Sequence, residues 1–178
     1  MSASKTTYTK DGAMNKIKKA IYPGTFDPLT LGHLDIVKRA LKIFDEITLA
    51  VALSSDKKPL FALKDRVAMA KACFADFDNV KVESYDNLLV DFATQKDTPI
   101  IIRGLRAISD FEYELQLGYA NQSLNPNIET VYLMPSLEYA FISSSVVRSI
   151  LKHDGDASHL LPPEVKKLIE DKNLVRSI

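Results

Sequence analysis

The chain has 178 residues, the length of one ordinary domain, and 46% of them are apolar, enough for a substantial core. Its 23 Lys and Arg residues balance 23 Asp and Glu residues, and this zero net charge argues against a nucleic-acid-binding protein, which needs a basic surface. No apolar run reaches the roughly 18 residues that span a bilayer, and no signal-peptide pattern is present, so we expect a cytoplasmic protein with no membrane partner. The single cysteine, Cys73, cannot form an internal disulfide, and we expect it to be buried.

Residues 1–15 are polar and lack periodicity, which predicts a flexible extension before a single domain over residues 16–178. One hypothesis is that Met14 is the natural start of the protein. From residue 18 onward, short β-branched runs alternate with helical patterns. The runs predict strands at 18–22, 47–53, 80–84, 100–103 and 130–134. The helical patterns lie at 32–44, 63–76, 88–96, 110–124 and 143–153, and a last helix follows Pro162 and Pro163.

This alternation of strands and helices predicts parallel strands joined by right-handed crossovers. The expected fold class is therefore α/β, with a doubly wound, mostly parallel five-stranded sheet and helices on both faces, as in Rossmann-like folds. Asp110 and Ser143 are the predicted N-caps of their helices. In such a sheet, ligands bind beyond the carboxyl ends of the strands, so candidate residues are sought there.

Residues 20–33 form the most informative motif, in which a short strand runs into a Pro-Gly turn and a Thr-x-Gly-His element then opens a helix. The motif brings Thr25, Gly32 and His33 to a helix N-terminus, where free N–H groups and the positive dipole end favour phosphate. A histidine there can donate to phosphate oxygens as their charge changes. Alone, His33 would be a structural residue, but Thr25, Thr30 and Gly32 around it favour a function in nucleotidyl transfer.

Basic and hydroxyl groups recur beyond the other predicted strands. Arg103 and Arg106 flank Gly104 at the end of the fourth strand, a pattern that favours a phosphate clamp over a solvated pair. A triple serine at 143–145 precedes a helix, and Arg148 follows one turn in. One serine would be enough for a cap, so three in succession favour donors around a polyphosphate.

Other polar residues are less decisive. The loop after the second strand contains Lys57 and Lys58, and functional and merely solvated interpretations are equally open for it. Sequence alone favours an exposed helix carboxylate for Glu114. His153 and His159 lack partners at metal-ligand spacing, so we expect no metal site built from the protein alone. Dinucleotide-binding glycine, Walker and nucleophile-elbow motifs are not found in the sequence.

In this order, the motifs resemble bacterial phosphopantetheine adenylyltransferases. The resemblance is carried by Tyr-Pro-Gly-Thr-Phe-Asp-Pro-x-Thr-x-Gly-His from residue 22, Lys-Lys-Pro from 57, Arg-Gly-Leu-Arg-Ala from 103, Asp-Phe-Glu-Tyr-Glu from 110 and Ile-Ser-Ser-Ser from 142. It covers residues 18–172, whereas Thr-x-Gly-His alone is shared by a wider nucleotidyltransferase superfamily. It implies transfer of the adenylyl group of ATP to 4'-phosphopantetheine, giving dephospho-coenzyme A and pyrophosphate in coenzyme A biosynthesis.

The resemblance also implies roles for individual residues. The catalytic donors would be His33, which stabilises the transition state, Lys57 and Arg106. Phosphopantetheine would be held by Thr25, Lys57, Leu89 and Arg103. ATP would be held by Thr25, Phe26, His33, Gly104, Leu105, Arg106, Glu114, Tyr139, Ala140, Phe141, Ile142, Ser143, Ser144 and Ser145. Mg²⁺ would bridge phosphate oxygens with few protein ligands, the protein would form a homohexamer, and coenzyme A would be a feedback inhibitor.

Three alternatives stay open. Another adenylyl or cytidylyl transferase, acting on nicotinamide mononucleotide or an alcohol phosphate, would share the fold and His33. A fragment related to class I aminoacyl-tRNA synthetases would have to contact tRNA, and zero net charge argues against that. A non-catalytic nucleotide sensor would bind ATP without releasing pyrophosphate.

Overall fold

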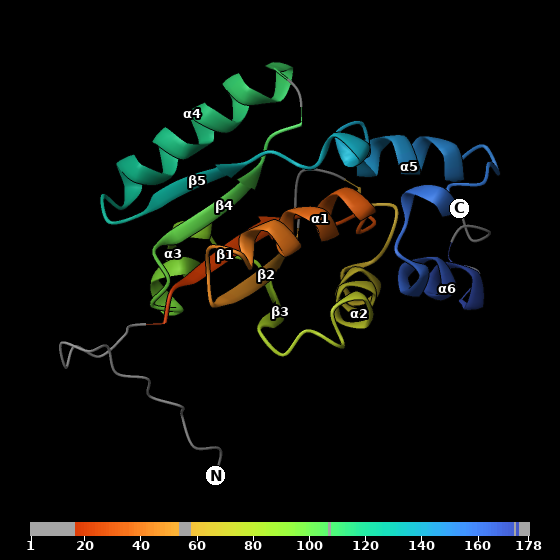
Figure 1. Ribbon diagram of the computed structural model, residues 1–178, viewed down its shortest axis with the longest axis horizontal. Coiled ribbons are helices and arrows are strands. Elements are labelled where there is room, and N and C mark those ends of the chain that lie inside the picture. The colour runs from red at the N-terminus through yellow and green to blue at the C-terminus, as the bar shows by residue number, and fades with distance from the viewer. Residues whose placement is uncertain (1–16, 54–57, 107, 173, 175–178) are drawn as a thin grey trace, which may run out of the picture.

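The computed structural model describes residues 17–53, 58–106, 108–172 and 174 (Figure 1). The expected extension over residues 1–15 lies outside these ranges. Within them, no helix is both long enough and apolar enough to cross a membrane.

The described chain forms a five-stranded parallel sheet in the order β3-β2-β1-β4-β5. The strands are β1 (Lys19–Gly24), β2 (Glu46–Ala52), β3 (Val80–Tyr85), β4 (Ile100–Gly104) and β5 (Glu129–Leu133). The chain first builds outward from β1 to β3 and then returns to place β4 on the other side of β1. The order therefore reverses between β1 and β4, which is where a doubly wound sheet opens a crevice for ligands.

Helices cover both faces of the sheet, which confirms the predicted fold class. They are α1 (Leu31–Ala40), α2 (Leu63–Cys73), α3 (Leu89–Gln95), α4 (Ile108–Leu124), α5 (Ser144–Leu151) and α6 (Pro163–Asp171), with short 3₁₀ helices η1 (Leu137–Tyr139) and η2 (Ser158–Leu160). Side chains alternate between the two faces of each strand. Ile21 and Ile101 therefore join α3 in a smaller core, while Tyr22 and Ile102 join α1, α2, α5 and α6 in a larger one.

The observed strands lie within two residues of the predicted ones, and the helices begin close to their predicted starts. Two helices end three or four residues earlier than expected: α1 stops at Ala40, where residues 41–43 form a tight turn, and α2 stops at Cys73. The Asp110 cap is wrong, because α4 already begins at Ile108 and Asp110 lies in its first turn. The Ser143 cap is confirmed, since its Oγ accepts the N–H of Val146 at 3.2 Å.

Candidate active site

A pocket of about 310 Å³ lies beyond the carboxyl ends of β1 and β4, at the reversal of strand order. Five segments that are distant in sequence meet around it. Its lining consists of residues 22–27, 32, 33, 36, 58, 59, 103, 104, 106, 114, 135, 142–145 and 148. Polar and basic groups gathered in this way suit a phosphate-bearing ligand.

His33 lies in the first turn of α1, and the backbone fixes its tautomer. The N–H of Thr30 lies 3.0 Å from His33 Nδ1, and an N–H can only donate, so Nδ1 is an acceptor without a proton. Thr30 Oγ1 lies at 3.0 Å from the same nitrogen. The neutral ring therefore carries its proton on Nε2. Burial, with the Arg106 charge as a smaller cause, lowers the pKa of the imidazole to about 3.

Glycine at position 32 lets two parts of the pocket approach each other. A Cβ on Gly32 would lie 3.2 Å from the carbonyl oxygen of Ile142 and 3.5 Å from that of Tyr139. Any side chain would therefore press against the segment that leads into α5. Glycine in the Thr-x-Gly-His element thus allows the N-terminus of α1 to pack directly on the backbone before α5.

Aromatic rings pack against His33 and against each other. Phe26 has a φ of 47°, in the left-handed region that side chains rarely adopt, and its ring packs edge-on against His33 with centroids 5.1 Å apart. Tyr22 packs edge-on against Phe26 at 5.5 Å. A Cβ on Gly24 would lie 2.9 Å from the Phe26 ring, so glycine is required there. The turn after β1 therefore holds the Phe26 ring against the His33 imidazole.

Arg103 and Glu114 form a bidentate pair on the β4 side of the pocket. Arg103 Nε and Nη2 donate to the two Glu114 carboxylate oxygens at 2.5 and 2.7 Å, and Nη1 donates to the Pro23 carbonyl at 3.3 Å. Only 14% of the Glu114 side chain is exposed, so the exposed carboxylate that the sequence favoured is wrong. The pair and the contact with Pro23 together leave two of the five Arg103 N–H groups for a ligand.

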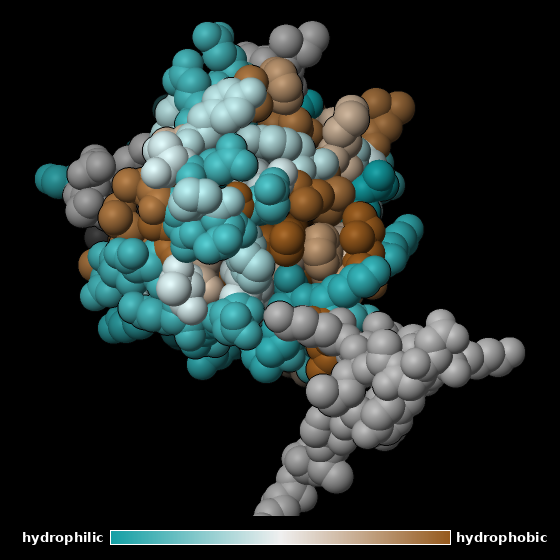
Figure 2. Space-filling view, turned by 90° about the vertical axis from the view of Figure 1, so that its left-hand side faces the viewer, coloured by the Kyte–Doolittle hydropathy of each residue, from teal (hydrophilic) through white to brown (hydrophobic). Residues whose placement is uncertain are grey.

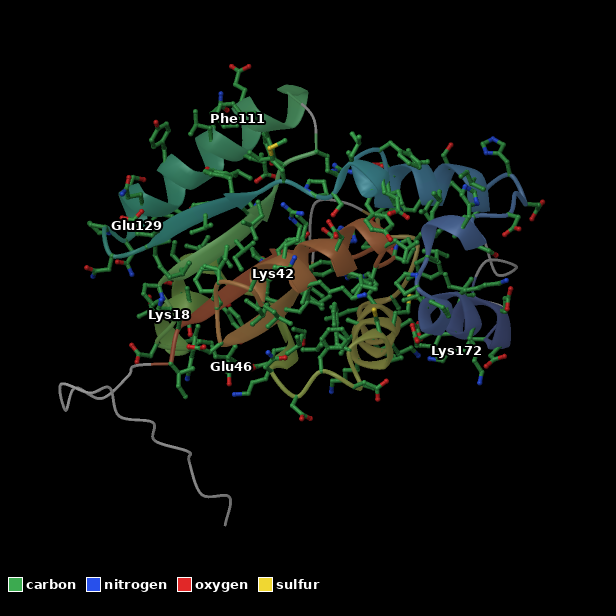
Figure 3. All side chains as sticks on the ribbon, viewed as in Figure 1. Lys18, Lys42, Glu46, Phe111, Glu129 and Lys172 are labelled. Atoms are coloured by element: carbon green, nitrogen blue, oxygen red, sulfur yellow. The ribbon has the colours of Figure 1, made fainter. Side chains whose placement is uncertain are left out.

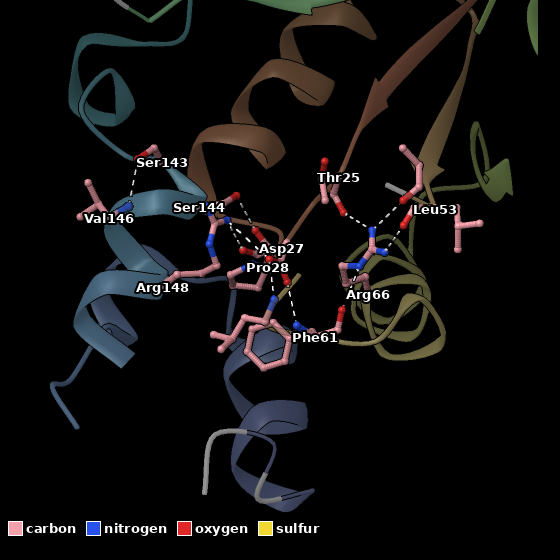
Figure 4. Close-up of polar contacts among 12 residues, drawn as sticks. Thr25, Asp27, Pro28, Leu53, Phe61, Arg66, Ser143, Ser144, Val146 and Arg148 are labelled. Atoms are coloured by element: carbon pink, nitrogen blue, oxygen red, sulfur yellow. Dashed lines mark hydrogen bonds and ion pairs between the residues drawn. The ribbon is translucent and has the colours of Figure 1, made fainter. Parts of the chain in front are cut away.

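The N-terminus of α5 forms another wall of the pocket. Ser143 caps the helix, and Ser144 Oγ donates to the Pro28 carbonyl at 2.9 Å (Figure 4). Arg106 Nη1 lies 3.5 Å from the Ile142 carbonyl, so the loop after β4 meets the same segment. Arg148 Nη1 donates to the Asp27 carbonyl at 2.8 Å. Helix N–H groups and two arginines thus face the pocket together, as polyphosphate binding requires.

Comparison with known proteins gives the family. A family model for cytidylyltransferase-like domains matches residues 21–150. A relative from Nautilia profundicola is 64% identical over 149 residues, which are 84% of this chain and 97% of its own. Relatives from Campylobacter hominis and Wolinella succinogenes are 60% and 59% identical, over 85% and 87% of this chain and 96% of each of theirs. All three are named phosphopantetheine adenylyltransferase. This chain belongs to the phosphopantetheine adenylyltransferase family.

Most of the residues that the family resemblance indicated do line the pocket. They are Thr25, Phe26, His33, Arg103, Gly104, Arg106, Glu114, Ile142, Ser143, Ser144 and Ser145. Lys57 lies outside the described residues, although its neighbour Lys58 is in the lining. Leu89, Leu105, Tyr139, Ala140 and Phe141 are not in the lining. Leu89 and Tyr139 instead pack against the two cores, and the Phe141 residue is 67% exposed.

Sequence reasoning missed several pocket residues and one residue that supports them. Asp27 lines the pocket without having been considered, and so do Lys58 and Arg148, which the sequence singled out but which no substrate set included. Arg66 does not line it but is buried directly behind Thr25. A signal for Arg66 was present, because Met69, Ala70 and Cys73 follow it at the spacing of one helix face and all are buried.

Proposed function

We propose that this protein transfers the adenylyl group of ATP to 4'-phosphopantetheine, giving dephospho-coenzyme A and pyrophosphate in coenzyme A biosynthesis. The observation that carries the proposal is 64% identity, over 84% of the chain, to a protein named for this activity. The pocket at the strand reversal provides a fitting place, with arginines and a helix N-terminus for phosphates.

In this proposal ATP lies between α1, the loop after β4 and the N-terminus of α5. Arg106 and the N–H groups at 143–145 bind the polyphosphate, and His33 Nε2–H donates to the α-phosphate. Gly104, Leu105, Glu114 and residues 139–142 complete the nucleotide site as the resemblance implies. The neutral tautomer suits this role because Nε2–H can donate throughout the neutral pH range.

The acceptor lies next to Thr25. The Arg103 N–H groups that Glu114 leaves free would bind the phosphate end of phosphopantetheine, together with Lys57, and Leu89 would contact its pantetheine arm. That phosphate is already a nucleophile, so no general base is needed. One of its oxygens bonds to the α-phosphorus while the bond to the β-phosphate oxygen breaks, and pyrophosphate leaves with that electron pair. The protein contributes alignment and charge stabilisation.

We propose that Mg²⁺ arrives with ATP as part of the substrate. No group of three potential metal ligands occurs among the described residues. The two carboxylates in the pocket lining are also engaged: Glu114 pairs with Arg103, and Asp27 accepts the N–H groups of Leu60 and Phe61. The chemistry of the site therefore fits an ion bound through phosphate oxygens and water, where it neutralises charge on the leaving group.

We also propose a homohexamer that coenzyme A inhibits, as the resemblance implies, and a cytoplasmic location. Large apolar side chains lie exposed on α4 and beyond β5, among them Tyr113, Tyr119, Met134, Leu137 and Phe141. Figure 3 labels Phe111 on α4, where it is 45% exposed, and Figure 2 shows apolar patches between hydrophilic residues on one face. Such surfaces fit contacts between copies. Light scattering should give a mass near six times 19.9 kDa.

Pyrophosphate release from ATP and Mg²⁺ tests the reaction, with phosphopantetheine, nicotinamide mononucleotide and an alcohol phosphate offered separately. We expect release with phosphopantetheine only. Release with another acceptor would make the protein a different nucleotidyltransferase, and ATP binding without release would favour the sensor. His33→Ala should lower turnover by about two to three orders of magnitude with little effect on ATP affinity. Near-normal turnover of this variant would remove His33 from the mechanism.

A further inference from the structure

A buried guanidinium lies behind the pocket. Arg66, in the first turn of α2, is 1% exposed and is not part of the pocket lining. Its Nη1 donates to the carbonyls of Thr25 and Ala52 at 2.6 and 2.8 Å. Its Nη2 donates to the Leu53 carbonyl at 3.2 Å, and its Nε to the Phe61 carbonyl at 3.1 Å. One side chain therefore binds four backbone carbonyls.

These carbonyls belong to three parts of the chain. Thr25 follows β1, Ala52 ends β2 and Leu53 follows it, and Phe61 precedes α2. Figure 4 shows the Arg66 guanidinium pointing at the backbone next to Thr25 and Leu53. Arginine suits this position because its planar fork provides five donors at fixed angles, whereas lysine has a single nitrogen. The arrangement fixes the distance between the ends of two neighbouring strands.

Asp27 holds the same segment from the opposite side. Its carboxylate oxygens accept the N–H groups of Leu60 and Phe61, both at 2.8 Å. Phe61 is thus bound through its N–H by Asp27 and through its carbonyl by Arg66. Lys58, three residues before Phe61, lines the pocket. The two contacts therefore position the segment that brings Lys58 beside the turn after β1.

We propose that Arg66 is a positioning residue for the acceptor side of the active site. It fixes the Thr25 backbone and residues 58–61 at the separation that an acceptor phosphate requires, without touching a substrate itself. The four hydrogen bonds of Arg66 reach neither residues 104–106 nor residues 139–145, which we propose for ATP, and they meet Thr25 only at its backbone carbonyl. Loss of Arg66 should therefore slow adenylyl transfer while ATP affinity stays the same. The inference rests on the proposed function.

The preceding residue provides a matched control. Asp65 is also buried, and its carboxylate accepts from Lys172 Nζ at 2.9 Å, which fastens α2 to the end of α6 (Figure 3 labels Lys172). Asp65→Asn weakens the attachment of α2 without removing a contact to the strand ends. It should lower the melting temperature while kcat stays within about twofold of wild type, because neither residue of that pair lines the pocket.

The experiment compares wild type, Arg66→Lys and Asp65→Asn at a temperature at which all three are folded by circular dichroism. For Arg66→Lys we expect kcat to fall by at least about 30-fold and KM for phosphopantetheine to rise, because small misplacements of reacting groups cost about 100-fold. The Kd for ATP by calorimetry should stay within about twofold of wild type. An Arg66→Lys variant with the kcat of wild type would overturn the proposal. So would an equal fall in kcat for Asp65→Asn, or a fall in ATP affinity that accompanies the fall in kcat of Arg66→Lys.

If Arg66→Lys does not fold, Asp27→Asn decides. This variant loosens residues 60–61 from the other side. It also removes a negative charge near the phosphates and the ion-pair partner of Arg148, whose Nη1 lies 3.6 Å from that carboxylate. Both electrostatic effects favour ATP binding and would give unchanged or faster turnover, whereas positioning predicts slower turnover with ATP affinity no weaker than that of wild type, so turnover at or above the wild-type rate would overturn the inference. Absence of wild-type activity with phosphopantetheine would instead refute the proposed function, and this inference with it.

Discussion

Acidification should destabilise this protein through His33. The folded imidazole is neutral because burial, followed by the Arg106 charge, lowers its pKa to about 3, from 6.5 in an unfolded chain. Protonation at Nδ1 would also break the bond from the Thr30 N–H. Between these two pKa values the unfolded chain binds a proton that the folded protein lacks. The stabilisation is therefore complete above pH 6.5 and is lost as the pH falls toward 3.

The size of this effect follows from the two pKa values. At pH 7.5 both states are nearly unprotonated at this residue, and at pH 5.0 only the unfolded state is protonated. The free energy of unfolding should then fall by about 2 kcal/mol between these pH values on account of His33. This is an upper limit, because the ring lines an open pocket and water there favours the charged form.

His33→Gln isolates this contribution. Glutamine at the third helix position can accept the same Thr30 N–H, as in a capping box, but it does not titrate. Urea unfolding of both proteins at pH 7.5 and 5.0 gives two differences in free energy of unfolding. The wild type should lose about 1–2 kcal/mol more than the variant. Losses that agree within about 0.5 kcal/mol would refute a His33 ring that is held neutral in the folded protein.

Three further predictions concern residues around and behind the pocket. Glu114→Gln leaves the Arg103 charge without its bidentate partner and should lower the free energy of unfolding by about 1–3 kcal/mol, measured in urea; no change would mean that the pair is not formed. Gly24→Ala brings a Cβ to 2.9 Å from the Phe26 ring and should cost about 1–3 kcal/mol, whereas an unchanged melting temperature would contradict the packing. Burial raises the pKa of the Cys73 thiol to about 12, so a disulfide reagent at pH 8 should label it only after unfolding, and rapid labelling of the folded protein would contradict its burial.

The sheet was predictable because its strands carry a strong local signal. Residues 47–51 of β2 are all buried, as expected for a strand that is covered on both faces, and the β-branched run of β4 is mostly buried too. The Thr-x-Gly-His element located His33 at the start of α1 for the same reason, since phosphate-binding helix starts have a local pattern. The strands and the start of α1 were therefore predictable because residues close together in the sequence determine them.

The misassigned residues depend on contacts between distant segments. Glu114 was interpreted as exposed because nothing nearby in the helix shows that Arg103 reaches it from β4. Arg66 looks like a polar helix residue until α2 is placed across the ends of β1 and β2. Burial of a charged side chain becomes favourable only when several partners converge on it, and those partners are set by the fold.

The most direct test of the proposed reaction uses phosphopantetheine with ¹⁸O at the three terminal oxygens of its phosphate, together with unlabelled ATP and Mg²⁺. Mass spectrometry would follow both products. If the acceptor phosphate attacks the α-phosphorus, dephospho-coenzyme A should retain all three labelled oxygens and pyrophosphate should carry none. The absence of dephospho-coenzyme A, or ¹⁸O in pyrophosphate, would contradict adenylyl transfer to phosphopantetheine by this pocket.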